Sequence, residues 1–439
     1  MNLRLRLTVM SFLQFFIWGS WLLTIGAYWF QTLPKRFPVI DETTHSSIWT
    51  GSSFGALFST MGIASLFMPP LLGIIADKWI NAEKLYGMCH ILGAVILFSL
   101  PMVSDPTTMF WVMLLNMMFY MPTLALAITV SYSALKRSGK DVVINYPPIR
   151  VWGTVGFIVA LWVVSLLHIE TSADQFYVAS CASLLLGLYA FTLPKCPPQL
   201  ARKKSESIID ILGLNSFILF RRRKMAIFFI FAMLLGAALQ LTNAYGDTFL
   251  HDFAKIDKYK DSIAVKYPAI IMSISQISET LFILAIPFFL RRFGIKQVMF
   301  ISMMAWVLRF GLFAFGNPGD GLWMIILSCI VYGMAFDFFN ISGSLFVESQ
   351  SDPAIRASAQ GLFMMMTNGI GAVLGSTLSG FVIQKYFTYA DDSKDWHGIW
   401  VTFSLYALAI AILFIIFFKH KHSPNALKNI QPEPLLRAE

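Results

Sequence analysis

The fold of this chain is decided by a polar, basic stretch near its middle, which reads Ala201-Arg202-Lys203-Lys204 and then Arg221-Arg222-Arg223-Lys224. On each side of it lie long apolar runs that are separated by short polar loops. A run of about 20 apolar residues is long enough to cross the roughly 30 Å hydrocarbon core of a bilayer as a helix. Twelve such runs are predicted, six before the basic stretch and six after it. The sequence thus predicts an all-α membrane protein built from two six-helix halves.

The same pattern predicts the domain boundaries. We expect residues 1–194 to form the first six-helix bundle and residues 225–418 to form the second. Residues 195–224 are expected to be a cytoplasmic basic linker, and residues 419–439 a cytoplasmic tail. The first apolar run is longer than the hydrophobic region of a signal peptide and has no small-residue cleavage site, so it should remain as the first span.

The composition of the 439 residues excludes several classes of protein. Hydrophobic residues make up 57% of the chain and charged residues 13%, whereas soluble proteins are about 25% charged. So little charge cannot cover a soluble globule, which excludes a soluble enzyme. The four cysteines are scattered, and the close pair His420 and His422 has no further ligand nearby, so neither a disulfide framework nor a metal site is indicated. No cofactor is expected.

The net charge of +9 is explained by membrane topology rather than by nucleic-acid binding. Most Lys and Arg residues fall in alternate loops, on the same side as both termini. Such an excess marks the cytoplasmic side, so both termini are expected in the cytoplasm. After the second run, Gly73-Ile74-Ile75-Ala76-Asp77-Lys78-Trp79 places an acid and a cation at a cytoplasmic helix end. Asp77 and Lys78 are candidate gating residues, although simple anchoring explains Lys78 equally well.

Polar side chains at membrane depth gather in the second half, and their cost in hydrocarbon makes them candidates for function. Gln240 and Asn243 lie three residues apart, as do Gln276 and Glu279, so each pair shares a helix face. Amides and carboxylates can bond to hydroxyl groups of a ligand. The competing explanation for the amides is hydrogen bonding between helices.

A later run carries Tyr332, Phe336 and Asp337. Tyr332 and Phe336 are four residues apart, so their rings lie along one side of a helix and can cover the face of an aromatic ligand. Asp337 and Glu279 lie near mid-depth and are the candidate proton carriers, with Asp337 preferred. The competing explanation for these acids is a buried ion pair with Arg309 or Arg150.

The first half is less polar, and its notable segment runs from Pro147 to Phe157. Arg150, Thr154 and Phe157 fall at helical spacing on one face. From the residues alone, Arg150 is better explained as an anchor at the cytoplasmic edge than as a ligand-binding group.

Several stretches resemble the bacterial nucleoside:proton symporter family of the major facilitator superfamily, namely residues 11–21, 147–157, 272–279 and 335–344. The 73–79 loop resembles the G-x-x-A-D-R/K loop of the same superfamily. The resemblance covers nearly the whole chain and implies twelve helices, a central nucleoside site and proton-driven import across the bacterial inner membrane. The partners that it implies are a nucleoside, protons and the lipid bilayer, and the expected functional unit is a monomer. The site residues that it implies are Arg150, Thr154, Phe157, Gln240, Asn243, Gln276, Glu279, Tyr332, Phe336 and Asp337.

Two features remain apart from this resemblance. The external loop 31–47, which contains Asp41, looks like an insertion relative to the family. A proton-coupled sugar or oligosaccharide symporter of the same superfamily is the alternative function, since sugar hydroxyls alone would explain Gln240, Asn243 and Glu279. A membrane-embedded enzyme would need a nucleophile with its base, or a metal set at depth, and the predicted spans offer neither.

Overall fold

The computed structural model describes residues 2–38, 47–198, 214–351 and 356–419 of the chain. Within these ranges the chain is helical, and the only strand-like pairing is one bridge between Thr388 and Lys394. The predicted all-α fold is therefore confirmed. The loop around Asp41, half of the basic linker and nearly all of the tail lie outside the described residues.

Two of the long helices of the first half begin at a side chain that caps a free N–H group. Thr50 Oγ1 accepts a hydrogen bond of 3.1 Å from Ser53 N, and an Asp105 carboxylate oxygen accepts one of 2.8 Å from Thr108 N. These bonds from Thr108 also hold the pKa of Asp105 below its usual value. The elements are α1 (Leu3–Gly19), α2 (Ile25–Ala27), η1 (Tyr28–Thr32), α3 (Leu33–Arg36), α4 (Gly51–Lys78), α5 (Ala82–Ser99), η2 (Leu100–Met102), α6 (Pro106–Arg137), α7 (Val142–Leu166) and α8 (Asp174–Ala190).

The second half contains one helix of unusual length. The sequence predicts two spans joined by a polar loop around Arg291, but helical structure continues through Arg291 and Arg292 and is interrupted only at Gly294, with φ 77°. Glycine tolerates this left-handed conformation because it has no Cβ. The elements are η4 (Leu214–Arg221), α10 (Arg223–Asp252), η5 (Phe253–Lys255), α11 (Ile263–Lys266), α12 (Pro268–Phe315), α13 (Leu322–Gln350), α14 (Arg356–Met364), η7 (Met365–Gly371), α15 (Ala372–Tyr386) and α16 (Trp396–Phe417).

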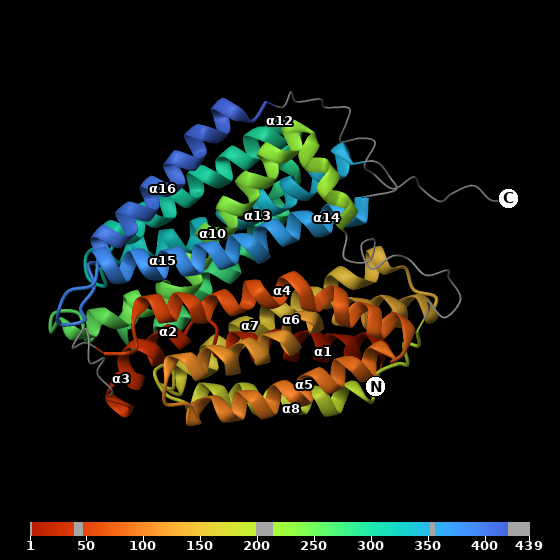
Figure 1. Cartoon of the computed structure of the whole chain (residues 1–439), viewed down its shortest axis with the longest axis horizontal. Helices are drawn as coiled ribbons and strands as arrows, with labels where there is room; N and C mark the ends of the chain where they lie inside the picture. Colours follow the sequence, from red (N-terminus) through yellow and green to blue (C-terminus); the bar gives the residue numbers. More distant parts are fainter. Residues whose placement is uncertain (1, 39–46, 199–213, 352–355, 420–439) are drawn as a thin grey trace.

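The helices form two groups that lie side by side (Figure 1). One group holds α1 and α4 to α8, and the other holds α10 and α12 to α16. They meet where α4 packs against α15 and where α7 packs against α12. Glycines permit the first of these contacts, since a Cβ at Gly380 would lie 2.4 Å from the carbonyl oxygen of Gly51 and 2.8 Å from Cα of Gly55. Small residues in these two helices thus allow their backbones to pack closely.

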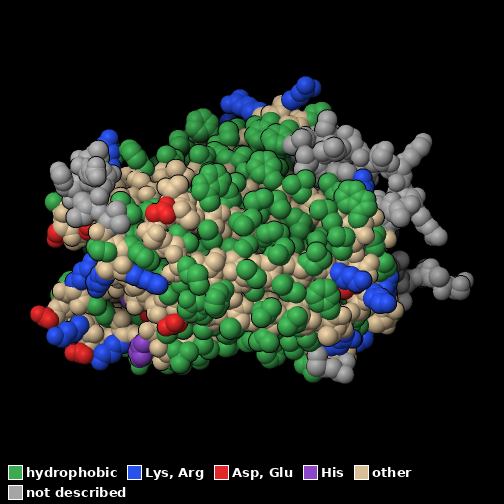
Figure 2. All heavy atoms as spheres, turned by 60° about the horizontal axis from the view of Figure 1, so that its bottom comes forward, with side chains coloured by type: hydrophobic (Ala, Val, Ile, Leu, Met, Phe, Trp, Pro, Cys, Tyr) green, Lys and Arg blue, Asp and Glu red, His purple; other side chains and the backbone are tan. Residues whose placement is uncertain are grey.

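The outer surface is suited to lipid. Nine helices in the described part of the chain are long and apolar enough to cross a membrane, and the longest of them, α12, contains the break at Gly294. Hydrophobic side chains cover the broad middle of the face in Figure 2, while most Lys and Arg side chains gather toward its two ends. Leu284 on α12 is an example of a strongly exposed hydrophobic side chain, with 76% of its surface exposed. Such exposure is costly in water but not in a bilayer, where hydrocarbon surrounds the side chain.

Candidate functional site

A cavity of about 400 Å³ lies between the two groups of helices. This volume is within the range of pockets for small organic ligands. Side chains from α1, α4, α6 and α7 form one wall, and side chains from α10, α12, α13 and η7 form the other. The cavity extends from the middle of the helices toward the end of the molecule that carries the N-terminus, where Met10, Ser131 and Tyr146 line it.

The structure brings together all the residues predicted to bind substrate except one. The lining includes Arg150, Thr154, Phe157, Gln240, Asn243, Gln276, Glu279, Tyr332 and Phe336. Asp337 is buried but does not line the cavity. The reason is helical geometry, because consecutive residues point about 100° apart and Phe336 occupies the face that meets the cavity.

The wall from the second half presents polar atoms that have no partner within the described protein. Gln240 Oε1 and Gln276 Oε1 are both buried and accept no hydrogen bond. A buried amide oxygen in this state costs about 1–3 kcal/mol. Beside them the rings of Tyr332 and Phe336 are parallel within 4°, with centroids 5.9 Å apart. The wall therefore offers hydrogen-bond acceptors next to an aromatic surface.

The wall from the first half is mainly aromatic and carries one cation. The Arg150 guanidinium lies over the Phe15 ring, with Cζ 4.1 Å from the ring centroid. Trp18 meets Phe157 edge-on at 6.5 Å, and its Nε1–H is buried without an acceptor. The anchoring explanation for Arg150 is incomplete, because its side chain also borders the cavity.

Gln14 is a cavity residue that sequence reasoning missed, together with Phe15, Trp18, Tyr146 and Asn368. Its side chain is fully buried, and both its amide oxygen and its amide nitrogen have hydrogen-bond partners. Gln14 Oε1 accepts from Tyr86 Oη at 2.6 Å and lies 2.9 Å from His90 Nε2, and Gln14 Nε2 donates to Thr123 Oγ1 at 2.8 Å. This network ties α1 to α5 and α6 beneath the cavity.

The acids do not form the buried pair that was considered from the sequence. Arg309 on α12 is fully buried, and its donors reach Thr242 Oγ1 at 3.3 Å, Ser275 Oγ at 3.4 Å and the Ser328 carbonyl oxygen at 2.7 Å. Within the described residues neither Arg309 nor Arg150 makes an ion pair with Glu279 or Asp337.

The two acids instead interact with each other across two helices. A Cβ at Gly333 on α13 would lie 2.6 Å from the backbone nitrogen of Glu279 on α12, so the helices cross there in backbone contact. Asp337 lies one turn farther along α13 and interacts electrostatically with Glu279. Asp337 Oδ2 is buried without a hydrogen-bond partner.

Comparison with known protein families identifies the family of the chain that forms this cavity. The model of the nucleoside H⁺ symporter family matches residues 1–423. The chain belongs to this family. Its members are transport proteins, so the family membership confirms that the chain is a membrane transporter of the bacterial inner membrane and not an enzyme.

Individual members of the nucleoside H⁺ symporter family resemble the whole chain. It is 55% identical to the xanthosine permease of Escherichia coli over 430 residues, which is 98% of this chain and 99% of the relative. It is 52% identical to the E. coli nucleoside permease NupG over 423 residues, covering 96% and 97%. The crystal structure of the nucleoside transporter NupG superposes with a TM-score of 0.87 at 52% identity, covering 96% of this chain and all of that one.

The candidate gating residues lie far from the cavity. Asp77 and Lys78 are at the C-terminal end of α4, where both side chains are partly buried. Neither makes an ion pair within the part of the chain that the structure describes. The nearby segment is held instead by Glu83, whose carboxylate accepts hydrogen bonds from Cys196 N at 2.7 Å and Asn81 Nδ2 at 3.0 Å.

Proposed function

We propose that this chain imports nucleosides together with protons by alternating access, with the cavity between its two halves as the binding site. The observation that carries the proposal is the pair of unpartnered amide oxygens, Gln240 Oε1 and Gln276 Oε1, in a cavity wall that also holds Glu279 and two parallel rings. Ribose hydroxyls are donors that satisfy such oxygens, and a base is a flat group that aromatic rings cover.

The topology that we propose has twelve spans, with both termini in the cytoplasm. Counting α12 as two arms on either side of Gly294, and counting α14 with η7 and α15 as one span, the helical elements supply this number. The proposed domains are residues 1–194 and 225–418, joined by the linker 195–224 and followed by the tail 419–439. In this orientation the cavity extends toward the cytoplasm, so the structure represents an inward-facing state. A monomer contains the entire proposed site, and we propose that it is the functional unit.

The proton is proposed to reside on the Asp337 and Glu279 carboxylates. Two buried carboxylates that interact repel each other when both are ionised, so binding of one proton relieves this repulsion. Glu279 borders the cavity and Asp337 does not. We therefore assign ligand contact to Glu279 and the proton-carrying role chiefly to Asp337. For Asp337 this keeps the proton-carrying role expected from the sequence and leaves out the ligand contact that the resemblance implies.

The loop at Asp77 is proposed to stabilise one access state, and its partner is absent in the described inward-facing arrangement. Asp77→Asn is accordingly expected to change the rate of transport more than the equilibrium affinity for nucleoside. Uptake kinetics and equilibrium binding on the same preparation measure the two effects. Parallel losses of rate and affinity would contradict a gating role.

The experiment that tests the proposed substrate is thermal stabilisation of the purified protein by a ligand panel. Because a ligand that binds only the folded protein raises the melting temperature, uridine, adenosine or xanthosine should raise it and glucose or lactose should not. The matched control is Gln276→Ala, in which the nucleoside effect should shrink. Stabilisation by the sugars alone would support the sugar alternative, which the nucleoside and xanthosine permease relatives do not favour.

A further inference from the structure

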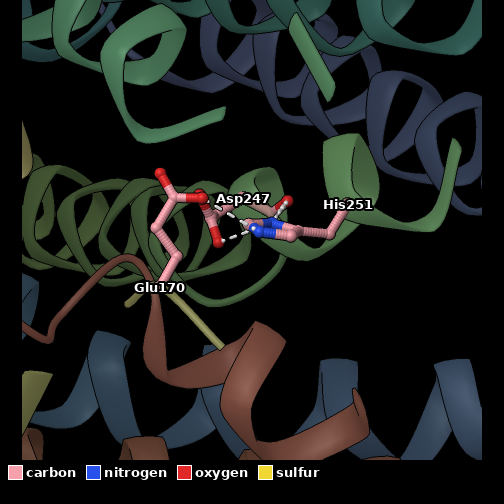
Figure 3. A group of neighbouring side chains, drawn as sticks. All are labelled: Glu170, Asp247 and His251. Carbon is pink, nitrogen blue, oxygen red and sulfur yellow. Dashed lines mark hydrogen bonds and ion pairs between the residues drawn. The ribbon is translucent and has the colours of Figure 1, made fainter. Parts of the chain in front are cut away.

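Three buried titratable side chains meet at the end of the molecule opposite the cavity mouth (Figure 3). Glu170 belongs to the turn between α7 and α8, in the first half. Asp247 and His251 lie one helical turn apart on α10, in the second half. Their side chains expose only 6%, 0% and 11% of their surface, respectively. The group therefore joins the two halves at a place that must separate when the transporter opens outward.

The imidazole of His251 lies between the two carboxylates. Its Nε2 is 3.0 Å from Glu170 Oε2, and its Nδ1 is 3.1 Å from Asp247 Oδ2 and 3.2 Å from the Asp247 carbonyl oxygen. The contact with the Asp247 carboxylate is a charge contact without hydrogen-bond geometry, and both carboxylate oxygens of Asp247 lack a donor. This buried acid has no other neutralising group among the described residues.

Glu170 is held in place from both sides of the interface. Its Oε1 accepts a hydrogen bond of 3.1 Å from Ala269 N at the start of α12. Its carbonyl oxygen accepts one of 2.8 Å from Gln175 Nε2, and Gln175 Oε1 accepts one of 2.7 Å from Thr24 Oγ1. The turn is thus rigid, and loss of the contact with His251 cannot be offset by a small shift of the Glu170 side chain.

The protonation state of His251 decides whether this arrangement is stable. A protonated imidazole has two N–H donors and one positive charge. Its Nε2–H donates to the Glu170 carboxylate, its Nδ1–H donates to the Asp247 carbonyl oxygen, and its charge neutralises the Asp247 carboxylate 3.1 Å away. A neutral imidazole has one donor, so one ring nitrogen faces a carboxylate oxygen with no hydrogen between them, and two negative charges stay buried. Closure with a neutral ring is therefore much less favourable than closure with a charged one.

The other charged groups nearby have partners of their own. Asp252, which follows His251 in the chain, accepts a hydrogen bond of 2.9 Å from Trp396 Nε1 and pairs with Lys255 Nζ at 2.9 Å. His168 on the α7–α8 turn packs against the Tyr267 ring, with centroids 5.3 Å apart. The titratable groups that act directly on His251 are Asp247 from its own helix and Glu170 from the other half.

We propose that Glu170, Asp247 and His251 form a proton-dependent latch that holds the outer face closed. The latch is closed when His251 carries a proton. Loss of that proton removes the Glu170–His251 contact, which leaves the hydrogen bond from Ala269 N as the tie of Glu170 to the second half, so the halves separate more readily. This assignment rests on the proposed orientation and places a second proton-binding group in the transport cycle, distinct from Glu279 and Asp337. Uptake of a proton from the outside then favours closure of the outer face, in the direction that import requires.

A metal ion is the other occupant that an imidazole and two carboxylates accept. The geometry favours the proton, because the two carboxylates lie at different ring nitrogens, whereas a metal would need both of them at the same nitrogen. Chelation of metal ions therefore separates the two alternatives.

The experiment measures the distance between the halves at the outer face. Spin labels are placed at Leu167→Cys in the first half and Ile263→Cys in the second, positions that are 61% and 59% exposed. Cys181, the exposed natural cysteine, is replaced by Ser. Distance distributions are recorded from about pH 5 to about pH 9, a range in which histidines titrate. In the parent protein the open fraction should rise about ten-fold or more as the pH increases.

The variants decide the assignment. His251→Gln and Glu170→Gln should each abolish this dependence on pH, with His251→Gln shifted toward the open form. His397→Gln, which replaces another outer-face histidine, should leave the dependence on pH intact.

Stabilisation of each variant by uridine shows whether it is folded and whether the nucleoside site is intact, so failure of the latch and failure of the proposed function give different results. A response independent of pH in the parent protein would refute the latch. An unchanged response in His251→Gln, or a response that EDTA removes, would refute it equally.

Discussion

The two walls of the cavity differ in how their polar groups are satisfied. In the first half, Gln14 uses its amide oxygen and nitrogen on Tyr86, His90 and Thr123, all within the protein. In the second half, Gln240 and Gln276 leave their amide oxygens without donors. Satisfied networks fix a structure, whereas unsatisfied buried groups raise the energy of the empty site and gain most from a ligand. We therefore propose that Gln14 and its partners form a scaffold in the first wall, whereas Gln240 and Gln276 in the second wall accept hydrogen bonds from the substrate.

The largest expected effect concerns Asp337, the buried acid of the second half. Asp337→Asn should abolish uphill uptake but retain exchange of nucleoside across the membrane, because an amide cannot carry the coupled proton. The driving force lost is about 2.3 kcal/mol per proton at 100 mV, which supports roughly fifty-fold accumulation. Nucleoside-driven proton uptake in proteoliposomes is the measurement. If accumulation stays intact in Asp337→Asn, the carrier is Glu279 or another group, and intact coupling in the double variant would exclude both carboxylates.

The next effect concerns ligand affinity at the second wall. Gln276→Ala and Glu279→Ala should each weaken uridine binding about ten-fold or more, because a substrate hydroxyl loses its buried partner at a cost of about 1–3 kcal/mol. Isothermal titration of purified protein gives the dissociation constants. Wild-type affinity in both variants would show that these side chains do not hold the substrate.

A smaller effect distinguishes scaffold from receptor directly. Tyr86→Phe removes the hydroxyl that donates to Gln14 Oε1 at 2.6 Å and should lower stability by about 1 kcal/mol, while uridine affinity stays unchanged. Gln276→Met should do the opposite in the absence of ligand, since it removes an unpaired buried oxygen and keeps the side-chain volume. Melting temperatures of the empty proteins provide the comparison. Equal losses in both variants would remove the distinction between the walls.

The smallest effect concerns a contact between the halves outside the membrane spans. Lys394 Nζ lies 3.8 Å from the centroid of the Phe30 ring, and burial lowers the pKa of this lysine from 10.5 to about 8. Between these values the unfolded chain binds more protons than the folded one, so stability rises with pH in that window. The melting temperature of the parent protein should therefore rise relative to Lys394→Met above about pH 8. The charges of Asp252, Lys255 and Asp392 act on the same amine and are present in both proteins. Identical pH profiles for the two would exclude a buried amine.

Most of the cavity wall from the second half could be predicted, because its polar residues lie at helical spacing within apolar runs. Gln276 and Glu279 share a face that the sequence reveals, and the family resemblance added Arg150 and Thr154. Gln14 was not predicted as a cavity residue, because a single amide in a run rich in Phe and Trp gives no local sequence signal. Its hydrogen-bond partners lie at least 72 positions away in the chain.

Two other results required the folded chain. The family resemblance implies ligand contact for Asp337, but in the structure this residue does not line the cavity, because Phe336 occupies that face and adjacent helical residues point about 100° apart. Glu170 was not recognised at all, because an acid in a turn between apolar runs is indistinguishable from an ordinary polar loop residue. Its significance comes from His251, which packing of the two halves brings within 3.0 Å.

The glycine contact between α4 and α15 has a consequence for engineering the transport cycle. In the proposed orientation it lies toward the outer ends of both helices. A Cβ at Gly55 would come within 2.3 Å of the Ser376 carbonyl oxygen there, and one at Gly380 within 2.4 Å of the Gly51 carbonyl oxygen. No flexible side chain is available there to move aside, so an added methyl group acts as a wedge that the closed outer face cannot accommodate. Alanine at either position thus offers a way to trap the outward-open conformer for crystallisation or for raising antibodies against it.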